Sequence, residues 1–161
     1  MDKKVITLLD EQVNKELHSA YIYLGIAKYF SDQKLSGFAS WYKAQAQEEV
    51  EHGMKIYDYL LDNDCDVSLP DVEGVSTSYK SPLEAVKAAD EHEHYITGEI
   101  CKIYDAAVKA KDYRTQLFLN WFITEQEEEE KNSGEMVDKV TLLGKDAANL
   151  YLLDKELGSR E

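Results

Sequence analysis

Glutamate side chains interrupt the apolar faces of four long segments of this chain. When residues are placed at about 100° per position, as in an α-helix, each segment shows one apolar stripe, and each stripe is broken near its middle. The residues that break the stripes are Glu16, Glu49, His52, Glu93, Glu125 and Glu129. Mid-helix positions lie at a similar height in a bundle whichever way each helix runs. We therefore expect these side chains to meet in one layer of the core.

Such a layer of buried carboxylates needs compensating charge. An ionised carboxylate that is buried without a partner costs several kcal/mol, and no lysine or arginine lies on these stripes at the same level. Protonation could neutralise some of the acids, because like charges raise one another's pKa. Two divalent cations bridged by carboxylates would satisfy both the charge and the lone pairs, and a histidine would add a nitrogen ligand. The pattern therefore predicts a two-metal site.

The spacing within the second segment agrees with metal binding. Glu49 and His52 form a Glu-x-x-His unit, which places two ligands one turn apart on one helix face. This unit also occurs by chance, so the prediction depends on its combination with Glu16, Glu93 and Glu129 at a matching level. The structural alternatives are local polar breaks for Glu16 and Glu93 and a hydrogen-bonded core histidine for His52.

The acidic run over residues 125–130 has two interpretations. Most runs of this kind are solvated helix faces. Helical spacing, however, turns Glu125 and Glu129 toward the apolar stripe. The other members take different positions: Glu127 and Glu130 point to the surface, while Gln126 and Glu128 flank the inward pair.

Other polar residues lie near the predicted site. Tyr23 follows Glu16 by two turns on the same stripe, and an ordinary core role and a redox or supporting role both remain open. His92 and His94 flank Glu93 but point away from the stripe. We expect both histidines to be exposed.

Composition excludes several classes of function. The formal net charge is −14, which argues against nucleic acid as a partner because phosphate binding needs clustered lysine and arginine. No run approaches the roughly 20 apolar residues that a membrane span needs, and the start of the chain leads into an amphipathic segment and not a secretory signal. Cys65 and Cys101 provide no disulfide framework. We therefore expect reduced thiols and a cytoplasmic protein.

The chain contains only two prolines and eight glycines, which favours long helices over many short strands. Tyr104 and Phe118 continue the third and fourth apolar stripes and are expected in the core. The predicted elements of a single all-α domain, residues 1–161, are helices at about 5–30, 36–61, 82–110 and 113–143, a crossover at about 65–80, and a short fifth helix at about 146–157.

Two helix ends are well marked. Ser81 is a predicted N-cap, Pro82 takes the first helical position, and Glu84 would complete a capping box. At the other end of the fourth helix, Gly144 is a suitable residue for the position just after the last turn.

Loop lengths predict the topology. Breaks of a few residues join the first helix to the second and the third to the fourth, so each pair is antiparallel. The middle connection has about 17 residues and could span over ~50 Å, which exceeds the ~40 Å length of a 27-residue helix. The third helix can then run parallel to the second. An up-down-down-up bundle with one long crossover is the ferritin-like arrangement.

Four blocks of sequence resemble those of bacterial non-haem ferritins. The likeness extends over essentially the whole chain, including Trp121 and the tail at residues 151–157. The blocks are NKEL at 14–17, AQEEVEH at 46–52, EHE at 91–93 and EQEEE at 125–129.

The resemblance implies a hollow shell of 24 identical subunits, with a fifth helix near its four-fold axis, that oxidises Fe²⁺ with dioxygen and stores ferric oxyhydroxide mineral. It also implies three iron sites, and it places Tyr23 beside the di-iron centre. Glu16, Glu49 and His52 would hold the first iron; Glu49, Glu93 and Glu129 would hold the second, with Gln126 close by; and Glu48, Glu125, Glu128 and Glu129 would form a third, weaker site.

Departures distinguish the chain from other ferritin-like families. Bacterioferritins repeat Glu-x-x-His on the fourth helix, where this chain has Gln126-x-x-Glu129. They also carry a haem-ligating methionine directly after the bridging glutamate, where this chain has Val50. No haem is therefore expected, and the absence of a CxxC motif excludes a rubrerythrin-type iron domain.

Two other classes of function remain open. A smaller assembly could be a di-metal oxygenase or oxidase that acts on an organic substrate, and it would need an access pocket beside the site. A purely structural bundle would bind no metal. The ligand types also leave manganese and zinc as alternatives to iron.

Overall fold

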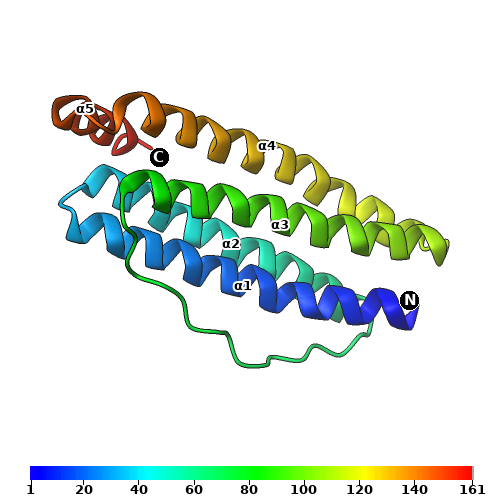
Figure 1. Ribbon diagram of the computed structural model, residues 1–161. Helices are drawn as coiled ribbons and strands as arrows, with labels where there is room; N and C mark the ends of the chain where they lie inside the picture. Colours follow the sequence, from blue (N-terminus) through cyan, green and yellow to red (C-terminus); the bar gives the residue numbers. More distant parts are fainter. Residues whose placement is uncertain (161) are drawn as a thin grey trace.

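The computed structural model describes residues 1–160. These residues form five helices and no strand. Four long helices form a bundle, and the short fifth helix lies at one end of it (Figure 1). The all-α fold predicted from the sequence is thus confirmed. The helices are α1 (Lys3–Asp32), α2 (Ser36–Asp62), α3 (Pro82–Lys109), α4 (Tyr113–Leu143) and α5 (Ala147–Leu157).

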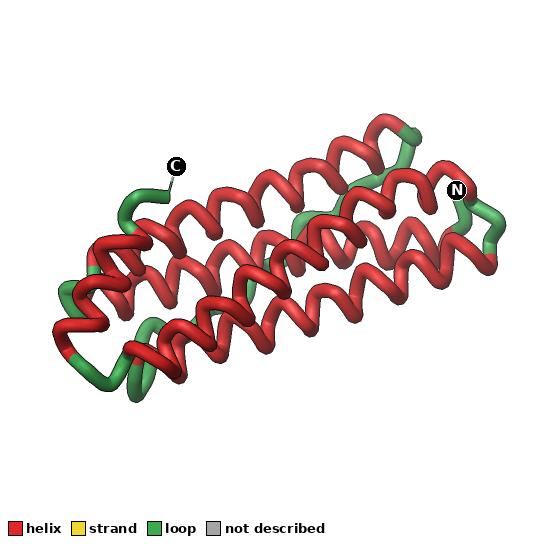
Figure 2. Tube along the Cα trace, turned by 90° about the horizontal axis from the view of Figure 1, so that it is seen from above, coloured by secondary structure: helices red, strands yellow, loops and turns green. Residues whose placement is uncertain are grey.

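The connection between α2 and α3 runs the length of the bundle along α1, so α3 starts beside the start of α2 and runs parallel to it (Figure 1). The tube in Figure 2 shows from above that the long helices lie side by side along one common direction. Asp10 of α1 accepts a hydrogen bond from the backbone N–H of Ser68 at 2.8 Å. At Gly25, a Cβ atom would lie 2.2 Å from the carbonyl oxygen of Ser76. Glycine therefore lets the crossover pack directly on α1.

The first three helices end in the same way. The residue after each C-cap has a left-handed backbone, although none of the three is glycine, and the next N–H bonds back to a carbonyl five residues earlier, as in a Schellman motif. The left-handed residues are Lys34, Asp64 and Lys111, with φ of 62°, 55° and 55°. The hydrogen bonds run from Leu35 to Phe30, from Cys65 to Leu60 and from Asp112 to Ala107. Gly144 follows α4 as expected, but its φ is −73°, in the right-handed region.

The starts of α2 and α3 are capped differently. At α3, the Ser81 hydroxyl accepts from the Glu84 N–H at 3.1 Å, while the Glu84 carboxylate accepts from Lys80 and not from Ser81. At α2 the N-cap residue provides no side-chain bond. Asp154 of α5 accepts from the Phe38 N–H at 2.9 Å instead. A residue that is distant in sequence thus caps α2.

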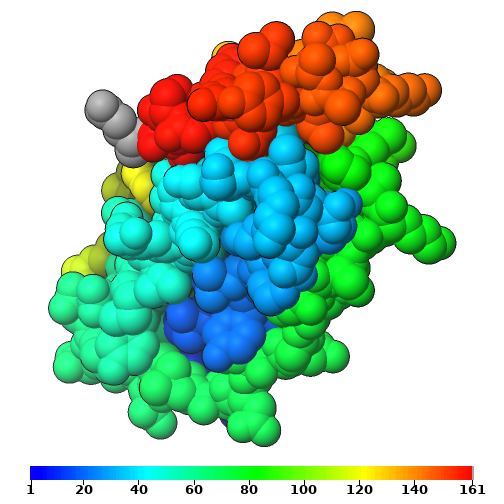
Figure 3. Space-filling view, turned by 90° about the vertical axis from the view of Figure 1, so that its left-hand side faces the viewer, coloured from blue at the N-terminus to red at the C-terminus, as the bar shows by residue number. Residues whose placement is uncertain are grey.

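The close approach of α5 to α2 also requires glycine. A Cβ atom at Gly37 would lie 1.7 Å from the Asp154 carbonyl oxygen. Figure 3 shows α5, in orange and red, lying across the end of the bundle over the cyan start of α2. The last helix therefore both covers and caps this end.

The apolar core consists of two clusters, one toward each end of the bundle. One cluster includes Phe30, Phe38, Tyr42, Val86 and Met136. The other includes Leu9, Ile56, Ile100, Leu119 and Phe122. Tyr104 and Phe118, which were expected in the core, are only partly buried at the edge of the second cluster. None of the described helices has a stretch long and apolar enough to cross a membrane.

Candidate metal centre

The layer between the two apolar clusters holds glutamates, one histidine and one glutamine that were predicted from the sequence for the site. Each of the four long helices contributes at least one of them, and each is at most 5% exposed. They are Glu16 on α1, Glu49 and His52 on α2, Glu93 on α3, and Gln126 and Glu129 on α4. Side chains separated by more than a hundred residues thus meet in one buried layer.

Two groups of three side chains in this layer have the geometry of metal ligands. Glu16, Glu49 and His52 form one group, and Glu49, Glu93 and Glu129 form the other. Within each group, one ligand atom from every residue lies within 4.8 Å of the others. Glu49 belongs to both groups, so a cation in each would share its carboxylate.

The structure places the residues of the third implied site differently. His52, Glu125 and Glu129 make a third group of this kind, whereas Glu48 and Glu128 join none among the described residues. Glu48 is paired with Arg160 instead, at 2.8 Å. Glu125 lies at the rim with its side chain 25% exposed. Gln126 was expected to flank the inward pair, but it is more deeply buried than Glu125, because only 3% of Gln126 is exposed.

One carboxylate oxygen in the layer has no hydrogen-bond partner. The Gln12 amide donates to Glu16 Oε1 at 2.8 Å, while the buried Oε2 of Glu16 receives nothing. Buried polar atoms are almost always paired. Burial and the nearby Glu49 raise the pKa of Glu16 well above its usual value. An oxygen-rich group with a free, buried carboxylate oxygen fits a hard or borderline divalent cation.

The pKa values in the layer also fit a site for cations. Burial and Glu49 raise the pKa of Glu93 to about 7, and burial and Glu93 raise the pKa of Glu129 to about 8. Burial lowers the pKa of His52, but its contact with Glu49 and the surrounding carboxylates outweigh this and raise the pKa to about 9. Without a cation, the protein therefore retains protons in this layer near neutral pH. A bound cation would displace them.

Tyr23 belongs to the layer through its hydroxyl group. This group donates a hydrogen bond to Glu93, and the ring stacks on Tyr42 with centroids 5.9 Å apart. Burial, Glu93 and Glu49 raise the pKa of Tyr23 well above its usual value, so the side chain is a neutral phenol. Its position is thus both a core position and a contact with a predicted ligand.

Three supporting residues escaped the sequence analysis. Gln12 and Gln45 each lie four residues before a glutamate of the layer, and Thr97 lies four residues after one. The Gln45 amide nitrogen donates to Glu49 Oε1 at 3.1 Å and to Glu129 Oε2 at 2.8 Å. Thr97 accepts from the Gln126 amide. Polar residues at i ± 4 from a predicted ligand share its helix face, and that spacing was the available signal.

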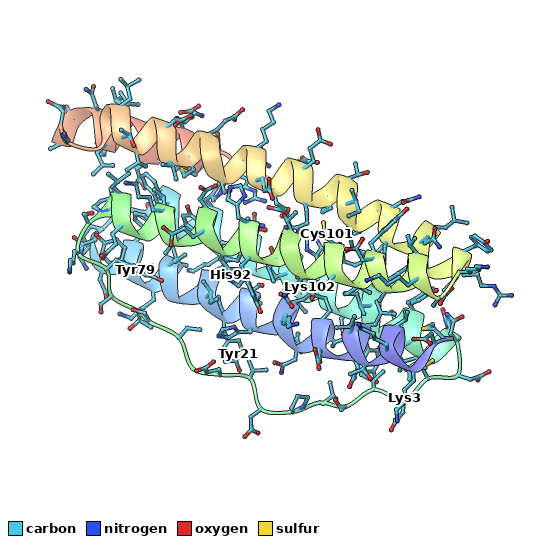
Figure 4. All side chains as sticks on the ribbon, turned by 45° about the vertical axis from the view of Figure 1, so that its right-hand side comes forward. Lys3, Tyr21, Tyr79, His92, Cys101 and Lys102 are labelled. Carbon is cyan, nitrogen blue, oxygen red and sulfur yellow. The ribbon has the colours of Figure 1, made fainter. Side chains whose placement is uncertain are left out.

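The exposure predicted for His92 is wrong. His92 is partly buried between α3 and α1, and its ring hydrogen-bonds the Ser19 hydroxyl at 2.6 Å; Figure 4 labels it on the side of α3 that faces α1. Burial lowers its pKa to about 4, so the ring is neutral. His94 is exposed, as predicted. The error arose because the α1–α3 contact buries residues on either side of the central stripe.

Comparison with known proteins agrees with this fold and layer. Residues 6–143 match the ferritin-like domain family. The chain is 38% identical over 160 residues to a bacterial non-heme ferritin of Staphylococcus haemolyticus, covering 99% of this chain and 96% of that protein. It is 36% identical to a bacterial non-heme ferritin of Campylobacter jejuni, covering 96% and 93%. The chain therefore belongs to the ferritin family.

The backbone of this chain is also similar to those of solved ferritin structures. An open-pore ferritin from Archaeoglobus fulgidus superposes with a TM-score of 0.98 at 38% identity, covering 100% of this chain and 99% of that one. A closed form engineered from the A. fulgidus ferritin gives a TM-score of 0.97 at 40% identity, covering 100% and 98%. The bundle with its short fifth helix is thus shared over its whole length.

Proposed function

We propose that this chain oxidises Fe²⁺ with dioxygen at the buried two-metal layer and stores the ferric product as an oxyhydroxide mineral inside a shell of 24 identical subunits. The observation that carries the proposal is the membership of Glu49 in both ligand groups, because a shared carboxylate holds two cations next to each other. The family relationship to bacterial non-heme ferritins supports iron as the metal and a shell as the assembly. The free cysteines Cys65 and Cys101 support a cytoplasmic location.

Each residue of the layer has a separate role in this proposal. Glu16 and His52 bind the first ferrous ion and Glu93 and Glu129 bind the second, while Glu49 bridges them. Iron is the substrate: two ferrous ions each lose one electron, and dioxygen takes up both electrons with two protons to leave as hydrogen peroxide. Adjacent cations stabilise charge on both oxygens of a bound molecule. Gln126 and Tyr23 hold Glu93 in place through their hydrogen bonds.

The second group is made of carboxylates alone, without histidine. Oxygen ligands favour the ferric product, and the loss of the nitrogen ligand weakens the hold on that iron. Glu125, at the rim beside His52 and Glu129, offers a further carboxylate on the way out of the layer. We propose that ferric iron leaves toward the mineral from this side, with Glu128 assisting beyond Glu125, and that Glu48 assists only when it is released from its ion pair with Arg160.

An oxygenase acting on an organic substrate is the second candidate, and the cavity beside the layer argues against it. The cavity that touches Glu129 and Tyr23 has a volume of about 20 Å³, whereas pockets that bind small organic molecules measure about 300–1,000 Å³. The adjoining cavity of about 270 Å³ is lined by none of the predicted metal ligands. Dioxygen and metal ions are small enough for a site of this kind. Gel filtration separates the two candidates further, because a shell of 24 subunits elutes at several hundred kilodaltons and a small oxygenase does not.

Mixing apoprotein with Fe²⁺ in air tests the proposal. We expect ferric absorbance to develop on the order of 10–100-fold faster with the unaltered protein than with Glu49→Ala or His52→Ala. Glu127→Ala is the matched control, because Glu127 is an exposed glutamate on the same helix as Glu129, and its rate should equal that of the unaltered protein. Equal rates in all four proteins would rule out oxidation at this layer.

A further inference from the structure

The side of the buried layer between α2 and α4 is the open side of the bundle. In the described part of the chain, no Cα atom of α2 comes within 8 Å of a Cα atom of α4. A cavity of about 270 Å³ lies there, near the end of α5. The cavity of about 20 Å³ beside Glu129 shares Trp41, Asn132 and Met136 with it. The two cavities therefore adjoin, and the smaller one reaches Gln45 and Glu129.

Arg160, which follows α5, lies in the wall of the larger cavity. Its guanidinium group stacks over the Trp41 ring at 4.3 Å and donates to the Trp41 carbonyl oxygen at 3.1 Å. It also forms an ion pair with Glu48 at 2.8 Å, with only 17% of the arginine side chain exposed. The arginine is thus held by stacking, by a hydrogen bond and by an ion pair, all on α2.

The same guanidinium group orients an amide of the buried layer. Both of its terminal nitrogens donate to Gln45 Oε1, at 3.4 Å. Because a guanidinium group can only donate, it fixes the oxygen of the Gln45 amide toward the cavity. The amide nitrogen then faces inward, where it bonds Glu49 and Glu129. Arg160 is in this way connected to the bridging carboxylate through a single side chain.

We propose that Arg160 is a tethered cation at the α2–α4 side of the carboxylate layer: it occupies one oxygen of Glu48, competes with free cations for that carboxylate, and positions Gln45 against Glu49 and Glu129. This inference rests on the proposed function, since this side matters only if cations use the layer. Arg160 touches neither metal ligand group directly, so its role is positioning and electrostatic. The Glu48 side chain is already 42% exposed, so movement of the segment after α5 would free the oxygen that Arg160 occupies.

The charge of Arg160 determines the size of the expected effect. A unit charge within about 5 Å of a bound multivalent ion weakens its binding roughly three- to tenfold at low ionic strength, and salt screens the effect. The variant Arg160→Gln removes the charge but keeps a polar side chain. Arg160→Lys keeps the charge on a flexible chain. Lys139→Gln removes a cation from the wall of the same cavity, where Lys139 pairs with Glu156 at 3.3 Å.

Tb³⁺ is a suitable probe for Glu48 in protein whose buried layer has first been filled with Zn²⁺, because it prefers oxygen ligands and its luminescence is sensitised by a nearby tryptophan such as Trp41, which lies beside Arg160. We expect Arg160→Gln to lower the Tb³⁺ concentration at half-saturation roughly three- to tenfold. Arg160→Lys and Lys139→Gln should stay within twofold of the unaltered protein. The double variant Glu48→Gln/Arg160→Gln should not show the increase in Tb³⁺ affinity, because the carboxylate that pairs with Arg160 is absent.

A separate calorimetric titration with Zn²⁺ counts the ions in the buried layer of each variant. Two tight ions per chain in every variant, with the Tb³⁺ gain restricted to Arg160→Gln, support the role of Arg160. Identical Tb³⁺ curves for Arg160→Gln and the unaltered protein, or an equal gain in Arg160→Lys, would overturn it while leaving the two-metal layer intact. Fewer than two tight Zn²⁺ ions in the unaltered protein would overturn the proposed function itself.

Discussion

Aromatic and aliphatic side chains fill both ends of the bundle, whereas carboxylates fill the layer between them. At the ends, burial of apolar surface stabilises the fold directly. In the layer, burial raises the pKa of Glu93 and Glu129 and leaves an oxygen of Glu16 without a partner. Different parts of the same helices therefore serve stability and charge binding. The ends supply stability, and the middle gives some of it up to hold charges close together.

The largest effect should come from the apolar end that lies under α5. Phe30 is fully buried and stacks on Phe38 with ring centroids 4.5 Å apart. Phe30→Ala should lower the free energy of unfolding by about 3–5 kcal/mol through lost burial and a cavity. Urea unfolding at a fixed protein concentration measures this. Zn²⁺ binding should stay unchanged, and a loss of binding without a loss of stability would contradict the division between the ends and the middle.

The acidic layer should make the stability of the apoprotein depend on pH. The folded-state pKa values of Glu93, Glu129 and His52 lie above their ordinary values. The stability that these groups contribute is present below their ordinary pKa values, 4.5 for the glutamates and 6.5 for His52, and is lost as pH rises to their folded-state values of about 7 to 9. The pKa of His92 is lowered from 6.5 to about 4, so His92 changes the stability only below about pH 6.5.

We expect the apoprotein to lose on the order of 2 kcal/mol between pH 6.5 and 9. Thermal unfolding across this range checks the sign. Because cations bind the deprotonated carboxylates, Zn²⁺ should reverse the slope and release protons into a weakly buffered solution. An apoprotein that became more stable toward pH 9 would contradict the protonated state assigned to the layer.

A single change in the layer should separate stability from binding. Glu16→Gln removes one acid from the cluster but keeps an acceptor for Gln12. The apoprotein should become more stable at alkaline pH, because the variant removes a buried acid whose ionised form is unfavourable. Zn²⁺ affinity at the group of Glu16, Glu49 and His52 should fall by at least about tenfold. Calorimetry and urea unfolding on the same sample measure both changes, and a variant that was both less stable and equally able to bind would refute this account.

The smallest effect concerns the cap that joins α5 to α2. Asp154→Ala removes the acceptor of the Phe38 N–H and should cost about 1 kcal/mol, as expected for an N-cap. The end of the chain should also become more sensitive to limited proteolysis. Asp138→Ala, which changes an exposed aspartate of α4, is the control and should leave both measurements unchanged.

Much of the fold followed from helical periodicity and loop lengths. A long polar connection between two helical pairs was enough to predict that α3 runs parallel to α2. Tyr104 and Phe118 pack against the core as expected but are only partly buried, because periodicity gives a direction but not the distance to the neighbouring helix. Gln45 was missed because an amide on an apolar stripe has no distinctive sequence signal until its partners are known. Arg160 was missed for the same reason, since its partners lie more than a hundred residues away.

The sequence by itself determined which helices form and which of their faces carry carboxylates, because both depend on local spacing of residue types along each helix. Only the tertiary structure decided which acids share a cation site, that Glu49 belongs to two groups, and that Glu48 is already paired with Arg160. These relations depend on the rotation and depth of each helix relative to the others. Packing of the whole bundle sets those quantities, and no single segment encodes them.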